Sequence, residues 1–186
     1  MKKKIAFLIL SILVATATAS AQWQDEGPLN RWSKRPVARI TGSEESIYLT
    51  DVRVARHTGF DRLVFEFTGG LPSYRITYAG KFDFTGPDNK QIKVKGKSVI
   101  SINLQPLPYP ESEDHEDVVL PICKARMRSF IEIKETEWFE AVRAFLVGLK
   151  AKRPFRVKEL TNPYRLVIDF GNRLVRNWPQ PPLEER

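Results

Sequence analysis

The chain has 186 residues and a formal net charge of +8, because 30 Lys and Arg residues outnumber 22 Asp and Glu residues. This positive charge favours acidic partners such as anionic glycans or an anionic membrane surface, whereas the absence of any recognition motif argues against nucleic acid. The single cysteine, Cys123, excludes an intramolecular disulfide, so the stability of the fold must come from packing.

The first 21 residues have the three-part pattern of a cleavable secretory signal. Three lysines are followed by an apolar run from Ile5 to Val14 and then by small residues that end in Ala19-Ser20-Ala21. A membrane anchor is the alternative, but this run of ten residues is about half of the roughly 20 that a membrane-spanning helix needs. We therefore expect an exported, soluble protein, periplasmic or secreted, with no transmembrane segment after cleavage.

Cleavage after Ala21 leaves 165 residues, which is a usual length for one domain, and 27 basic against 22 acidic residues, a net charge of about +5. Residues 22–35 contain Gly, Pro and scattered polar residues, and we predict a flexible, poorly ordered lead-in there. Residues 177–186 are rich in proline and predict an extended tail. The domain itself is expected to span residues 36–176.

Apolar and polar side chains alternate along much of this domain, with the period of two that half-buried strands have. The predicted strands lie near residues 62–67, 74–78, 99–104, 131–133, 155–157 and 165–170. Clusters of Gly, Pro, Asn and Asp separate them at residues 58–59, 69–72, 86–89 and 162–163. Short alternating strands at this spacing predict an all-β fold, a sandwich or a barrel.

One segment, residues 139–149, fits two structures. Its apolar residues can be placed on one face of a helix, so a single short helix near residues 137–147 is an alternative to a strand. Gly148 and the β-branched Val142 and Val147 favour the strand, which is our prediction.

Several of these segments together resemble the AMIN-like domain of exported bacterial proteins. The resemblance covers about 120 residues and rests on residues 51–67, the run Gly69-Gly70-Leu71-Pro72, residues 73–78, Val147-Gly148-Leu149, residues 153–157 and residues 162–170. It implies a compact β-sandwich of mostly antiparallel strands. It also implies a relation to AMIN domains, which are attached to cell-wall amidases and secretins and bind peptidoglycan or associated envelope components.

A turn between two predicted strands brings together an imidazole, a carboxylate and a guanidinium, those of His57, Asp61 and Arg62. Such a turn can bind a sugar or a peptide carboxylate, with Arg62 donating two parallel hydrogen bonds. The purely structural alternative, which we favour, has Asp61 capping the turn and Arg62 pairing with Glu66 on the same strand face.

A second candidate site joins an aromatic and basic strand to lysines spaced by two, namely Tyr74 and Arg75 on the first and Lys93, Lys95 and Lys97 on the second. Alternation predicts that the three lysines share one face of a strand, where they can meet an anionic polymer. In the structural alternative, Tyr74 and Tyr78 belong to the core and the lysines protect a solvated edge strand.

The remaining features do not predict chemistry. The acidic residues 111–117 lack the glycine-bearing pattern of a calcium loop and are best explained as a solvated loop, and Cys123 as a small buried residue. No zinc-protease helix, nucleophile elbow or phosphate-binding glycine loop is present, so we predict no catalytic residue, metal or cofactor.

These observations favour a non-catalytic exported module that binds the cell envelope, with peptidoglycan or another envelope glycan as its ligand. The alternative is a module that docks onto an envelope protein, for which the Pro-rich tail is suited. A small hydrolase is the third hypothesis, since 22 acidic residues offer many carboxylate pairs and none stands out. The ligand, the partner, the sheet order and the oligomeric state stay open.

Overall fold

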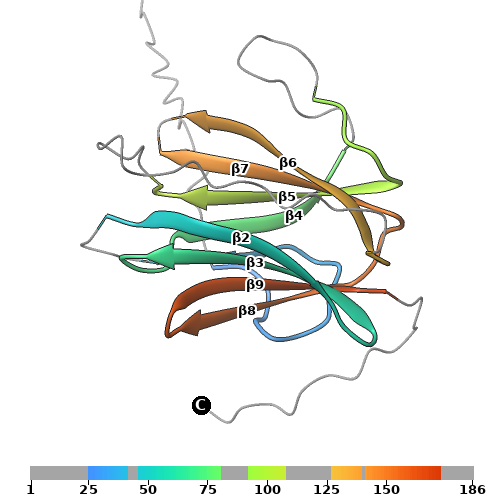
Figure 1. Cartoon of the computed structure of the whole chain (residues 1–186), viewed down its shortest axis with the longest axis horizontal. Helices are drawn as coiled ribbons and strands as arrows, with labels where there is room; N and C mark the ends of the chain where they lie inside the picture. Colours follow the sequence, from blue (N-terminus) through green and yellow to red (C-terminus); the bar gives the residue numbers. More distant parts are fainter. Residues whose placement is uncertain (1–24, 42–45, 81–91, 108–126, 140, 173–186) are drawn as a thin grey trace, which may run out of the picture.

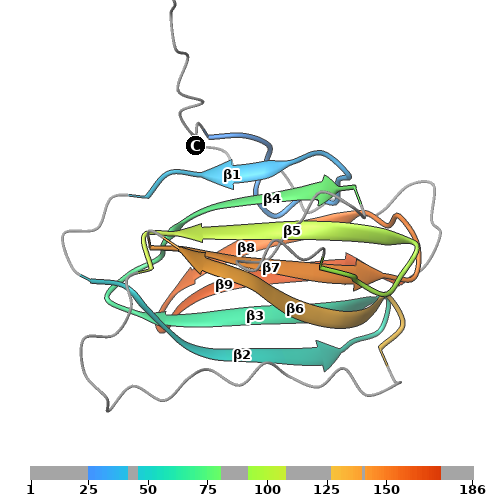
Figure 2. The same cartoon turned by 90° about the horizontal axis from the view of Figure 1, so that it is seen from above.

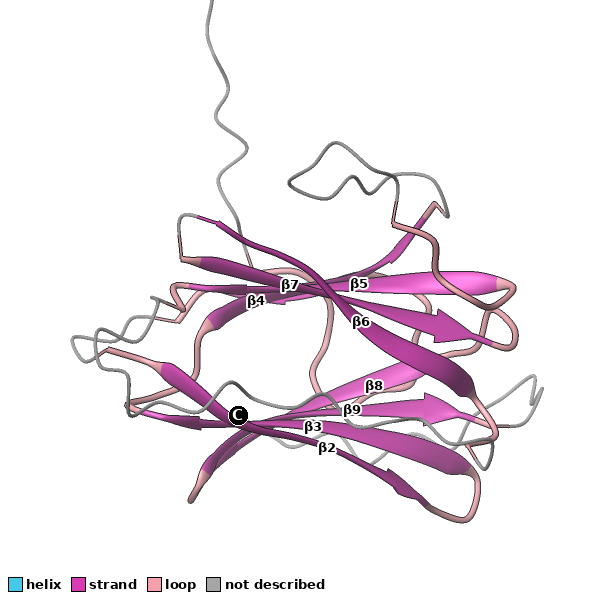
Figure 3. Ribbon diagram, turned by 45° about the horizontal axis from the view of Figure 1, so that its top comes forward, coloured by secondary structure: helices cyan, strands magenta, loops and turns pink. Residues whose placement is uncertain are grey.

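The computed structural model describes residues 25–41, 46–80, 92–107, 127–139 and 141–172. Within these ranges the chain forms nine strands and no helix (Figure 3), and therefore no helix that could span a bilayer. The predicted signal, the Pro-rich tail, the turn at residues 86–89, the acidic stretch and Cys123 lie outside the described residues.

The strands form two antiparallel sheets that are stacked on each other (Figure 1). The order of the five-stranded sheet is β1 (Val37–Arg39), β4 (Ser73–Ala79), β5 (Ser98–Gln105), β7 (Val142–Leu149) and β6 (Phe130–Phe139). The order of the four-stranded sheet is β2 (Tyr48–Arg56), β3 (Phe60–Thr68), β9 (Tyr164–Gly171) and β8 (Phe155–Thr161). This arrangement confirms the predicted all-β sandwich.

The core lies between the two sheets and consists of the alternating apolar residues that the sequence pattern indicated. Phe65 and Ile168 project from the four-stranded sheet, and Ile76, Ile102 and Phe145 from the five-stranded sheet, all with 0% exposure. Because successive side chains of a strand point to opposite faces, the residues between them lie on the outer faces of the sandwich. Each sheet therefore carries a second set of side chains on its outer face, spaced regularly along its strands.

Most of the ambiguous segment is strand β7. Strand β7 lies between β5 and β6, and its inward residues are Phe145, Val147 and Leu149. The strand prediction is therefore confirmed, and the alternative of a short helix near residues 137–147 is wrong, because both edges of β7 are used in sheet hydrogen bonds. A backbone segment crosses the outer face of β7 at Gly148, where an added Cβ would lie 1.9 Å from the carbonyl oxygen of Lys95.

The described part of the predicted lead-in, residues 25–35, differs from our expectation of a poorly ordered segment. This N-terminal strap makes backbone hydrogen bonds to β8, from Asn30 N to Val157 O at 2.7 Å and in both directions between Ser33 and Phe155. It also pairs with β1 through Glu26 and Ala38. Because β1 and β8 lie at the same edge of the sandwich, the strap links the two layers there (Figure 2).

The strands at the opposite edge are irregular. Strand β2 has a shift of register between Leu49 and Asp51, and β6 has one between Phe130 and Glu132 and another between Glu135 and Glu137. Such irregularities bend a strand and interrupt its row of unpaired backbone groups.

Polar contacts join the two layers within the apolar interior. The hydroxyl of Tyr74 on β4 donates to Oε1 of Glu159 on β8 at 2.8 Å, and the hydroxyl of Tyr78 donates to the carbonyl oxygen of Arg153. Burial raises the pKa of Tyr78 to about 12 and raises that of Tyr74 as well. Both tyrosines therefore hold the sheets together in their neutral form.

The two tyrosines predict a loss of stability at alkaline pH. Folding raises the pKa of Tyr78 above its unfolded value of about 10. The contribution of its neutral hydroxyl to the free energy of unfolding is therefore complete below pH ~10 and is lost as the pH rises toward about 12. Denaturant unfolding between these values should show a steeper decline for the wild type than for Tyr78→Phe. Tyr164→Phe, at a residue that is 39% exposed, is the control and should follow the wild type; identical slopes in all three proteins would contradict the assignment.

Candidate functional site

Three charged side chains lie side by side across the outer face of the four-stranded sheet. In the register of the sheet, Arg62 on β3 is directly opposite Asp169 on β9, and Asp169 is directly opposite Arg156 on β8. Their neighbours along each strand, such as Leu63, Ile168 and Val157, point into the core. Alternation therefore places all three on the outer face, and we call them the arginine row.

Asp169 is the centre of the row and is completely buried. Its carboxylate accepts from Nε and NH2 of Arg62 at 2.6 and 3.0 Å, and from Nε and NH2 of Arg156 at 3.2 and 2.6 Å. The two arginine side chains are 27% and 15% exposed. A carboxylate without access to water needs such partners, and these forked hydrogen bonds fix both guanidinium planes.

Aromatic side chains border the row. The indole of Trp32 in the N-terminal strap lies 4.7 Å from the guanidinium carbon of Arg156, and the ring of Phe60 lies 5.2 Å from that of Arg62. The exposed imidazole of His57 stacks on Phe60 with 4.7 Å between ring centroids. Cations and aromatic faces attract at these distances, so the rings further restrict the guanidinium groups.

Lys158 adds a third cation to this face. It follows Arg156 in the alternation of β8 and so lies on the same side of the sheet. Burial, followed by the positive charge of Arg156, lowers the pKa of its amine. Three cations against the single carboxylate of Asp169 leave this part of the surface with an excess of positive charge.

The structure separates the residues of the predicted His57 turn. His57 and Arg62 lie on or beside the outer face, whereas Asp61 is fully buried on the inner face and accepts from the backbone N–H of Ser129. Asp61 therefore does not cap the turn as we expected, because the alternation of β3 turns its side chain toward the other sheet. The predicted pair of Arg62 and Glu66 is also wrong, since Arg62 binds Asp169.

Glu66 has another partner on the same face. It pairs with Arg53 on β2, which also pairs with Asp51. These side chains are more exposed than the arginine row, at 46% for Arg53 and 45% for Asp51. They form a solvated group of ion pairs beside the buried one.

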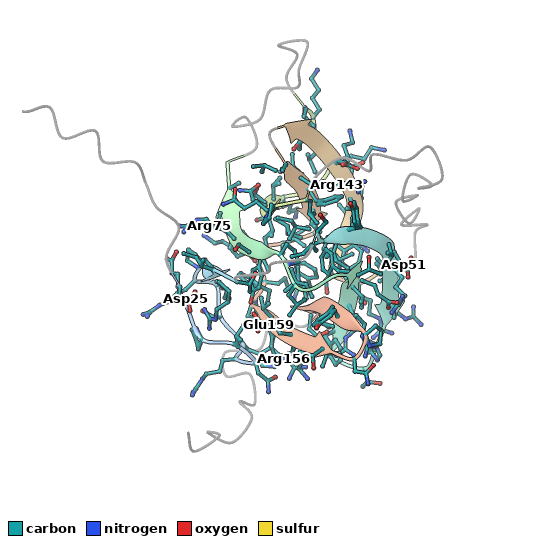
Figure 4. All side chains as sticks on the ribbon, turned by 90° about the vertical axis from the view of Figure 1, so that its left-hand side faces the viewer. Asp25, Asp51, Arg75, Arg143, Arg156 and Glu159 are labelled. Atoms are coloured by element: carbon teal, nitrogen blue, oxygen red, sulfur yellow. The ribbon has the colours of Figure 1, made fainter. Side chains whose placement is uncertain are left out.

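The second predicted site is not assembled as a unit. Tyr74 has 0% exposure and binds Glu159 inside the sandwich, as the structural alternative proposed, while Arg75 points outward and pairs with Glu26 at 2.9 Å. Figure 4 labels Arg75 and Glu159 on their separate elements.

The three predicted lysines do not lie on a strand. Strand β5 begins at Ser98, so Lys93, Lys95 and Lys97 precede it, although all three are exposed. The reason is that this backbone crosses β7 at Gly148, and its groups bond elsewhere: Lys97 N donates to Leu149 O at 2.7 Å. The lysines thus belong to a loop that covers the five-stranded sheet.

Sequence reasoning missed Asp169, Arg156, Lys158 and Trp32. A signal was present, because the charged residues of β8 and β9 alternate with buried apolar ones and must lie on the outer face. What the pattern could not provide was the order of β3, β9 and β8, which alone places Arg62 and Arg156 on either side of one carboxylate.

The arrangement offers groups that can bind an anion. Among the described residues of the row, these groups are hydrogen-bond donors and cations, and the carboxylate of Asp169 is occupied by two arginines. In the described parts of the chain, no three His, Cys, Asp or Glu side chains lie close enough together to hold a metal ion. Another ion pair, Arg143 with Glu135 at 2.6 Å, lies well away from Arg156 (Figure 4).

Removal of the central carboxylate should destabilise the domain. Asp169→Asn would leave two guanidinium groups side by side without their anion, and we expect the free energy of unfolding to fall by about 3 kcal/mol. Asp51→Asn, the same change at an exposed pair of the same sheet, should cost less than about 1 kcal/mol. Chemical denaturation measures both, and equal losses would mean that the buried row stabilises the fold no more than an exposed pair does.

The comparisons with known proteins identify the family. No curated protein and no solved structure matches the chain. The sequence model of the AMIN-like domain family matches residues 47–172, a range that begins before β2 and ends just after β9. It includes Arg62, Arg156 and Asp169, whereas Trp32 lies before it. Since this match spans more than half of the sequence, the chain belongs to the AMIN-like domain family.

Proposed function

We infer that this protein is a non-catalytic binding module of the cell envelope, and that it binds an envelope glycan, with peptidoglycan as the first candidate. The binding surface is the outer face of the four-stranded sheet around the arginine row. The observation that carries the proposal is the excess of cations in this row, which are fixed beside aromatic side chains on the outer face of one sheet.

The chemistry of such a surface fits a glycan that carries negative charge. Arginines that are already fixed lose little conformational entropy when they bind a ligand, so their donors are available at low cost. Aromatic rings such as Trp32 and Phe60 add apolar surface beside the arginines, which a sugar ring can contact. Membership of the AMIN-like family supports a role at the envelope, and the family match contains both arginines.

Binding to isolated cell-wall sacculi tests the proposal. The wild-type protein should sediment with protein-free sacculi, and its retention should weaken as salt is added. Lys158→Glu reverses a charge beside the row without touching the partners of Asp169, and we expect it to reduce the affinity roughly tenfold.

Lys97→Glu is the matched control. It makes the same change of charge on the loop that covers the five-stranded sheet, and should bind like the wild type. If both variants lose affinity equally, overall charge and not the sheet face causes retention. If the wild type does not sediment at all, binding to an envelope protein replaces glycan binding as the better hypothesis.

The proposal also requires export, which the N-terminal pattern of lysines, apolar residues and Ala19-Ser20-Ala21 supports. Expression of the whole chain in a bacterial host should yield an exported protein that begins at Gln22. Intact-mass measurement checks this, and a product that keeps Met1 and stays in the cytoplasm would contradict it.

A further inference from the structure

We propose that the arginine row and Lys158 form a receptor for one oxyanion group of the envelope polymer, a carboxylate or a phosphodiester. This inference rests on the proposed function and specifies which group of the polymer is recognised. It follows from the hydrogen-bonding groups that Asp169 leaves free, from the charge around them and from the position of the aromatic rings.

The first step concerns the donors. A guanidinium carries five N–H bonds on three nitrogens. Asp169 occupies only Nε and NH2 of Arg62 and of Arg156, and neither NH1 group has an acceptor among the residues that the structure describes. Both NH1 groups lie on the same face of the sheet, and Asp169 holds the two guanidinium groups in place through their other nitrogens. The NH1 groups therefore offer a second set of donors for another anion.

The second step concerns charge. With Arg62, Arg156 and Lys158 against Asp169, one bound monoanion would still leave a positive surface, so its binding is not opposed by like charge. Burial, and after it the positive charge of Arg156, lowers the pKa of Lys158, because both disfavour the ammonium form. An anion bound beside it would offset that effect and favour the charged amine.

The third step concerns direction. Trp32 lies 4.7 Å from the guanidinium carbon of Arg156, and Phe60 lies 5.2 Å from that of Arg62 and 5.7 Å from that of Arg156. Faces that the rings occupy are closed to a ligand, which must approach the N–H edges. Approach along the edge is the geometry in which arginine binds carboxylate and phosphate oxygens with two parallel hydrogen bonds.

Chemically treated sacculi distinguish the two sources of the oxyanion. Hydrofluoric acid removes phosphodiester-linked polymers and leaves carboxylates, while carbodiimide with an amine converts carboxylates to neutral amides and leaves phosphodiesters. We expect one of the two treatments to reduce the affinity of the full chain about tenfold, which is the usual effect of losing a charge-assisted hydrogen bond. The effective treatment identifies the group.

Retention that survives both treatments applied together would overturn the inference while leaving the proposed function intact. An absence of retention on untreated sacculi would contradict both proposals. The two hypotheses therefore fail in different ways.

Variants assign the effect to the row. Arg156→Lys keeps the charge but loses the fork of donors, and Lys158→Gln removes one charge without affecting the bonds of Asp169. Each should reduce retention on untreated sacculi about tenfold and become insensitive to the effective treatment. Lys97→Gln, on the other sheet, should keep both the affinity and the sensitivity.

The thermal midpoint of each variant is measured first, because Arg156→Lys alters a buried ion pair. If it unfolds, Lys158→Gln decides the question. Wild-type affinity in the folded variants, with unchanged sensitivity to treatment, would show that the oxyanion binds elsewhere.

Discussion

A carboxylate with no access to water, shared by two arginines, is the constraint on which the outer face of this sandwich depends. Asp169 has 0% exposure, and an isolated buried charge of this kind is very unfavourable. Arg62 and Arg156 offset that cost, but they do so from neighbouring strands, so the interaction requires the order β3, β9, β8. The same bonds that stabilise the sheet hold both guanidinium groups in fixed positions.

This double role explains how the outer face of a sheet can hold polar groups in fixed positions. In many binding sites a concave wall orients the polar groups, but here the regular spacing of a β-sheet orients them instead. Opposite residues in neighbouring strands have Cβ atoms about 5 Å apart, which is close enough for one carboxylate to hold two guanidinium groups. The aromatic rings of Trp32 and Phe60 then restrict the guanidinium groups further.

The period of the sequence predicted most of the fold. In runs such as residues 62–67 and 165–170, every second residue is a large apolar one, and these residues lie in the core. The family resemblance implied the sandwich; the family match confirms the family, and the two stacked sheets confirm the fold. The assignment of Lys93, Lys95 and Lys97 to a strand was wrong. An alternating pattern requires only that every second side chain be covered. A loop that crosses another strand, as this one crosses β7, meets that condition too.

The candidate site was only partly predictable. Arg62 was identified because it follows a turn rich in functional groups, but its partner is 107 residues away in the sequence. Pairs this distant are set by the order of strands, which local patterns do not encode. Asp61 and Tyr74 were placed in sites by their chemistry, yet their hydrogen bonds join the two sheets from inside. The direction of the side chain distinguishes these two inward residues from the outward Arg62, because neighbouring residues of a strand point to opposite faces of the sheet.

The N-terminal strap has a consequence for how the molecule meets other copies of itself. An exposed sheet edge is a template on which a strand of another chain can add. The strap occupies part of this backbone on β8 and on β1, while the register shifts of β2 and β6 break the regular spacing at the other edge. Edge-to-edge association is thereby disfavoured at both sides of the described sandwich.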